Sequence, residues 1–86
     1  MSNQVDDYYP TLKAAIAEAK AAGLNSLASK LEADAFAMYS SSSELLGEQG
    51  KAILAFLKLA GPKVPPSVSG KLEQCLIQIR KVWPQL

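Results

Sequence analysis

Few residues in this chain are of the types that perform catalysis, and those few lack the partners that catalysis needs. The 86-residue sequence contains no histidine and one cysteine. Histidine is the commonest general base and the commonest metal ligand, so a serine or cysteine nucleophile would lack its usual activating partner. Cys75 lies within an apolar helical stripe, which is typical of a buried small hydrophobic residue. The sequence therefore predicts neither a nucleophilic enzyme nor a cysteine-based zinc site.

Paired carboxylates are the second chemistry to consider, because they serve in acid–base catalysis and in di-metal sites. The close pairs are Asp6 with Asp7, Glu32 with Asp34, and Glu44 with Glu48. Asp6 and Asp7 lie at a predicted helix start, where carboxylates are favoured. Glu32 and Asp34 point in different directions from their helix. Glu44 and Glu48 share a helix face, but a di-metal site would need a second such pair. We predict no catalytic residue, no metal and no cofactor, and the sequence indicates no small-molecule substrate.

Phosphate and nucleic-acid binding would need concentrated positive charge. The segment Gly47-Glu-Gln-Gly50 has an acid where a phosphate-binding loop needs lysine, so no nucleotide site is predicted. Lys71, Arg80 and Lys81 could form a basic face on the outer side of the last predicted helix. The isoelectric point near 7.8 is low for a nucleic-acid-binding domain. Nucleic-acid binding through the basic C-terminal half is therefore kept only as the alternative function.

The charges are distributed unevenly along the chain. Residues 1–50 carry seven acidic residues and three lysines, a net charge of −4, whereas residues 51–86 carry six basic residues and one acid, a net charge of +5. We expect the two halves to attract each other inside one folded domain.

Apolar residues recur with helical spacing in four segments, near residues 7–22, 25–40, 43–60 and 67–83. The chain is 49% hydrophobic and 20% charged, which is typical of a globular domain rather than a disordered one. We predict one all-α domain, a small antiparallel four-helix bundle, with residues 1–5 disordered. A three-helix core with the first helix loosely packed is the alternative.

Local signals support the helix boundaries. Asp7 can cap the first helix and Gly23 suits its C-terminal end. Ser41 followed by Glu44 forms a capping box for the third helix.

Four further residues have more than one interpretation. Ser67 or Ser69 can cap the last helix. Gly47 weakens the third helix and indicates either a close approach of another element or a kink, as does Gly50 three residues later.

Three apolar residues lie outside the stripes of their helices and are the candidate partner contacts: Phe36, Leu54 and Ile77. We expect a non-catalytic protein–protein interaction module, such as an adaptor, chaperone, inhibitor or immunity-type protein. Its partner would be another protein or, less favoured, a second copy in a homodimer. The lone cysteine and an apolar run too short to span a bilayer indicate a cytoplasmic protein without membrane association.

Overall fold

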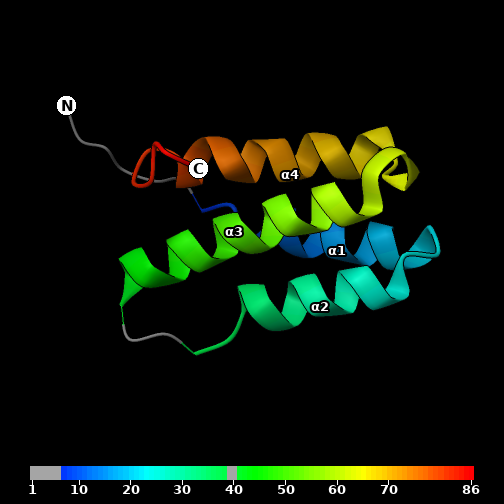
Figure 1. The fold of residues 1–86 in the computed structure, drawn as a ribbon, viewed down its shortest axis with the longest axis horizontal. Coiled ribbons are helices and arrows are strands. Elements are labelled where there is room, and N and C mark those ends of the chain that lie inside the picture. The colour runs from blue at the N-terminus through cyan, green and yellow to red at the C-terminus, as the bar shows by residue number, and fades with distance from the viewer. Residues whose placement is uncertain (1–6, 39–40) are drawn as a thin grey trace.

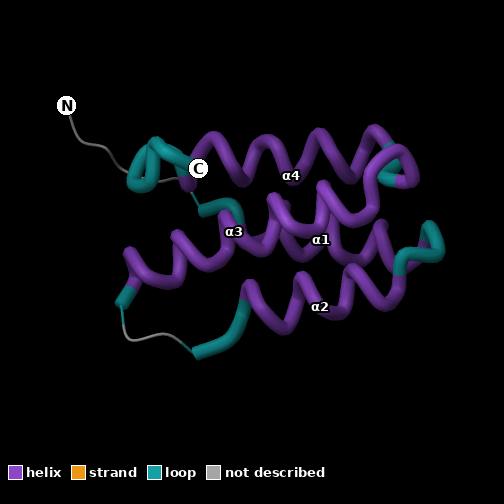
Figure 2. Tube along the Cα trace, in the orientation of Figure 1, coloured by secondary structure: helices purple, strands orange, loops and turns teal. Residues whose placement is uncertain are grey.

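The four apolar stripes form four helices that pack into an antiparallel bundle (Figure 1). The computed structural model describes residues 7–38 and 41–86. The helices are α1 (Tyr9–Ala21), α2 (Asn25–Ala35), α3 (Ser42–Ala60) and α4 (Pro66–Ile79), with a single 3-10 turn at Gly61–Lys63 before α4. Within those residues there is no strand. The connectors turn the chain back at the ends of the helices, so successive helices run in opposite directions (Figure 2).

Each helix packs against two others, in the order α1, α2, α3, α4 and back to α1. The first helix is an integral member, because Leu12, Ala15 and Ala19 on its inner face are fully buried. The alternative with a loosely packed first helix is therefore wrong. The prediction that residues 1–5 are disordered lies outside the described residues.

The tight turn between α1 and α2 follows the expected glycine signal. Gly23 has a φ of +92°, a left-handed conformation that glycine adopts without a steric penalty. The amide of Leu24 donates to the carbonyl of Ala19 at 3.0 Å, and the amide of Gly23 donates to Lys20 at 3.1 Å. This pair of bonds is the Schellman motif, which satisfies carbonyls at the helix end.

One predicted N-terminal cap is present, and Asp7 accepts a hydrogen bond near the start of α1 without capping it. The Ser41 hydroxyl accepts a hydrogen bond from the amide of Glu44 at 3.1 Å and caps α3. The Asp7 carboxylate accepts one from the amide of Tyr9 at 3.0 Å, although Asp7 lies one residue before the N-cap position. Both bonds satisfy amides that have no partner within the helix.

The serine caps predicted for α4 are absent. Pro65 occupies the N-cap position, and its extended backbone leads directly into the first turn. The Ser67 hydroxyl donates instead to the Glu18 carboxylate of α1 at 2.7 Å. Ser69 donates to the carbonyl of Pro66 at 3.2 Å, within its own turn. Both hydroxyls therefore have other partners.

Two helices end several residues earlier than predicted. α2 ends at Ala35 rather than at residue 40, and Phe36 then leaves the helix to place its ring against Tyr9, with ring centroids 5.7 Å apart. Residues 39 and 40, where the predicted helix ended, lie outside the described residues. α4 ends at Ile79 rather than at residue 83, because the chain folds back onto α3.

The segment after α4 explains both glycines of α3. Trp83 lies against Gly47, where an added Cβ would be 3.2 Å from the indole ring. Leu86 lies against Gly50, where an added Cβ would be only 2.5 Å from its Cδ1. The indole N–H of Trp83 also donates to the carbonyl of Ser43 at 2.8 Å. Of the two interpretations left open by the sequence, the close approach is the correct one.

A buried glutamine lies at the centre of the same end of the bundle. Gln49 of α3 is 0% exposed, and its Oε1 accepts a hydrogen bond from the Tyr8 hydroxyl. Its Nε2 donates to the carbonyl of Ala35 at 3.0 Å, at the end of α2. Cys75 of α4 is directed at the carbonyl of Tyr8, with its sulfur 4.0 Å away. One side chain therefore connects the start of α1, the end of α2 and the middle of α3.

The Gln49→Leu substitution is expected to lower the free energy of unfolding by about 1–3 kcal/mol for each buried group left without a partner. The groups concerned are the Tyr8 hydroxyl and the Ala35 carbonyl. Urea unfolding followed by circular dichroism measures the loss. The matched control is Gln74→Leu on the exposed side of α4, which should change stability by less than about 0.5 kcal/mol. Adding Tyr8→Phe to Gln49→Leu should recover part of the loss, and no recovery would contradict this interpretation.

Two glycine-to-alanine substitutions separate helix propensity from the contact with the C-terminal segment. Gly70 of α4 has nothing within 4 Å of an added Cβ, so Gly70→Ala should stabilise the protein by about 0.5–1 kcal/mol. Gly50→Ala gains the same propensity but must displace Leu86, and we expect it to be at least about 1 kcal/mol less stable than Gly70→Ala. The emission of the single tryptophan should shift only in the Gly50 variant. Equal stabilisation by both changes would show that the segment does not rest on α3.

Candidate interaction surface

One ion pair joins the acidic and basic halves of the chain across the bundle. Lys71 of α4 lies 2.6 Å from the Glu18 carboxylate of α1, and Ser67 donates to the same carboxylate. The hydrogen bonds from Lys71 and Ser67 lower the pKa of Glu18 below its usual value. Lys20 and Glu32, both from the acidic half, form a second bridge at 2.9 Å between α1 and α2. Among the described residues, the Lys71–Glu18 pair is thus a contact between the two halves that crosses the bundle.

The predicted basic face is divided by these contacts. Lys71 is paired with Glu18, and the Nε of Arg80 donates to the carbonyl of Leu86 at 2.6 Å. Lys81 is exposed in the turn after α4. Two of the three cationic side chains therefore bind acceptors within the same chain. The three do not form a concentrated basic surface together.

The three predicted partner contacts lie on different parts of the chain and in different environments: Phe36 just after α2, Leu54 on α3 and Ile77 on α4. Phe36 is partly buried, because its ring packs edge-on against Tyr9 and lies below the ammonium group of Lys13, 5.7 Å from the ring centroid. Leu54 is also partly buried against the core. Ile77 on α4 is 57% exposed. Whether any of the three contacts a partner stays a prediction.

Cys75 and Tyr8 are the buried titratable groups of the core. Cys75 is 0% exposed, and burial raises the pKa of its thiol to about 11. Burial likewise raises the pKa of the Tyr8 hydroxyl above its ordinary value. Both groups are therefore neutral at physiological pH and unsuited to nucleophilic attack.

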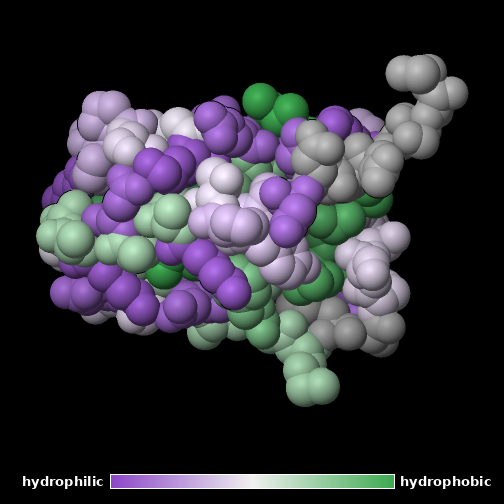
Figure 3. Space-filling model, turned by 180° about the vertical axis from the view of Figure 1, so that it is seen from behind, coloured by the Kyte–Doolittle hydropathy of each residue, from purple (hydrophilic) through white to green (hydrophobic). Residues whose placement is uncertain are grey.

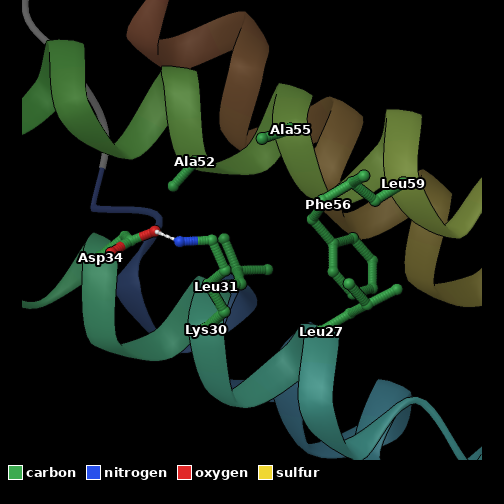
Figure 4. A pocket seen from close by; sticks show the side chains of 8 residues that line it. All are labelled: Leu27, Lys30, Leu31, Asp34, Ala52, Ala55, Phe56 and Leu59. Carbon is green, nitrogen blue, oxygen red and sulfur yellow. Dashed lines mark ion pairs between the residues drawn. The ribbon is translucent and has the colours of Figure 1, made fainter.

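The large apolar residue that the structure leaves exposed on α3 is Leu59, at 62%. Leu59 borders a shallow groove between α2 and α3. The side chains of Leu27 and Phe56 point into this groove from its two sides (Figure 4). Ala52 and Ala55 line the α3 side of this groove. Their short side chains make this wall of the groove apolar, and the groove itself is narrow, because Phe56 and Leu31 are buried within it.

Charged residues border one end of the same groove. Lys30 and Asp34 of α2 form an ion pair at 3.3 Å, which Figure 4 shows across one turn of the helix. Glu48 and Lys51 of α3 form another at 3.4 Å. All four residues line one depression that also contains Ala52 and Ala55. We call the groove and this border, residues 27, 30, 31, 34, 48, 51, 52, 55, 56 and 59, the α2–α3 face.

The other described surfaces are less suited to binding a partner. A cleft of about 550 Å³ lies beside the C-terminal segment, but its apolar wall consists of Trp83 and Leu86, which already contact Gly47 and Gly50. On the opposite side of the molecule, hydrophilic and neutral residues separate the apolar ones into several areas (Figure 3). The part of the chain that the structure describes contains no cluster of side chains able to hold a metal ion. None of its helices is long and apolar enough to cross a membrane.

No local signal in the sequence marks Leu59 as an exposed residue. It lies three residues after Phe56, at helical spacing, yet Phe56 is buried and Leu59 is exposed. The chain matches no known protein family, no curated protein and no solved structure.

Stability should fall as the pH rises from about 8.5 toward 11. The unfolded chain releases the thiol proton near its ordinary pKa of about 8.5, whereas folded Cys75 holds it to about 11. Within this window the unfolded state binds fewer protons, so the free energy of unfolding decreases with pH by up to about 1.4 kcal/mol per unit. Urea titrations at several pH values should give a shallower slope for Cys75→Ala. Identical slopes for the two proteins would contradict a buried neutral thiol.

Proposed function

We propose that this chain is a small non-catalytic protein–protein interaction module and that its α2–α3 face is the surface that contacts the partner. The observation that carries the proposal is Leu59. It exposes 62% of its surface beside an apolar groove, rather than standing alone among polar neighbours. An apolar groove with a charged border is the usual composition of a protein-binding surface.

The remainder of the molecule supports a binding function more than a catalytic one. The neutral Cys75 and Tyr8 are buried, and the polar side chain of Gln49 is used to join helices. We place the interaction in the cytoplasm, because the free thiol of Cys75 suits a reducing compartment.

Substitution of Leu59 by glutamate tests the surface. We expect Leu59→Glu to reduce partner capture at least tenfold in a pull-down from source cells, because it places a charge in the apolar centre of the contact. Its thermal unfolding should stay close to that of the unmodified protein, since Leu59 is exposed.

Ile77→Glu is the matched control, because Ile77 is 57% exposed on α4, outside the α2–α3 face. This variant should retain the partner. Loss of binding in the Ile77 variant alone would move the surface to α4 and overturn the proposal. Equal binding by all three proteins would overturn it as well.

A further inference from the structure

We infer that the partner of the α2–α3 face is a second copy of this chain, arranged about a two-fold axis that runs along the groove. This inference rests on the proposed function and adds the identity of the partner. In such a dimer, α2 of each copy faces α3 of the other, with corresponding levels of the groove in contact. Two-fold interfaces require a surface that is complementary to itself, and the α2–α3 face meets this requirement in both apolarity and charge.

The apolar end of the face is the first part of this match. Leu27 of α2 and Leu59 of α3 lie at the same level of the groove, on its opposite sides (Figure 4). Rotation about the groove axis places Leu59 of one copy against Leu27 of the other, twice in each dimer. The small side chains of Ala52 and Ala55 allow the two backbones to come close between these contacts. The exposed leucine thereby gains an apolar environment in the dimer.

The charged residues are the second part of the self-complementarity of the α2–α3 face. Asp34 of α2 and Lys51 of α3 border the same depression from opposite sides. The two-fold rotation therefore places Asp34 of one copy opposite Lys51 of the other, again twice. The four charged residues of the face sum to zero, since Lys30 and Lys51 balance Asp34 and Glu48. A face with this composition does not repel its own copy, and complementary charges fix the register of association.

The size of the α2–α3 face determines how strongly two copies should associate. α2 has 11 residues and is therefore about 16 Å long, so the contact belongs to the small end of known interfaces. We expect a dissociation constant of about 10–500 µM, in keeping with a weak interface of this size. Sedimentation equilibrium from about 5 µM to about 1 mM should show the mass rising from 9.2 kDa toward twice that value. A constant mass of 9.2 kDa over the whole range would overturn the inference.

A pair of charge reversals tests the geometry itself. Asp34→Lys places two lysines opposite each other at both contacts of the homodimer, and Lys51→Glu places two acids there. Each variant alone should dimerise at least tenfold more weakly than the unmodified protein. In an equal mixture of the two variants, every contact again joins a lysine and an acid. We therefore expect the mixture to associate within about threefold of the original affinity, since its charge pairs are equivalent.

Matched charge reversals outside the face complete the design. Glu73→Lys on α4 and Lys81→Glu after α4 alter exposed charges in the same two directions. These variants should dimerise normally, alone and mixed. Circular dichroism melting of every variant checks that the fold is retained. Weak association of the mixed Asp34 and Lys51 variants would contradict the two-fold arrangement, because a general loss of stability or charge cannot be repaired by mixing.

The outcome also separates this inference from the proposed function. A monomeric protein whose pull-down still depends on Leu59 would overturn the second copy as partner and leave the α2–α3 face as the binding surface. A dimer that is unaffected by Leu59→Glu and by both charge reversals would show that self-association uses another surface, and would overturn the inference. A monomer whose pull-down is also independent of Leu59 would overturn both.

Discussion

The side chain of Gln49 is the point at which three helices of this bundle are joined. It accepts a hydrogen bond from Tyr8 before α1 and donates one to Ala35 at the end of α2. A buried amide without partners would be costly, so the ends of α1 and α2 must remain where these bonds can form. The apolar core supplies most of the driving force for folding, but it is not directional. The glutamine adds direction, because it fixes which ends of the helices lie together.

The contact of the C-terminal segment with α3 depends on the same end of the bundle. α3 has 19 residues and α2 only 11, so the first turns of α3 extend beyond the end of α2 (Figure 1). Trp83 and Leu86 cover those turns where α2 is absent, and the two glycines admit them. The second half of α3 has no such cover on its outer side. It is there that Leu59 remains exposed beside the groove with α2.

The parts of this structure that could be predicted are those encoded by neighbouring residues. The helical stripes gave the fold class, Gly23 gave the first turn, and Ser41 gave the start of α3. Gln49 could not be predicted, because its partners lie 41 and 14 residues away and one of them is a backbone carbonyl. The end of α4 was placed too late for a similar reason, since Trp83 has helical spacing but binds Ser43, 40 residues earlier. Periodicity placed Leu54 outside the stripe of its helix, yet Leu54 is partly buried against the core, because its burial depends on how α3 is rotated against its neighbours.

The dependence of α3 on Trp83 and Leu86 has a consequence for the order in which the protein folds during synthesis. Chains leave the ribosome from the N-terminus, so their early segments are made before the later ones exist. The first turns of α3 are made early, but Trp83 and Leu86, which cover Gly47 and Gly50, are each made 36 positions later. Until those residues are made, nothing covers the backbone of α3 at its two glycines. The nascent chain therefore completes one end of the bundle only after its last helix has been built and turned back.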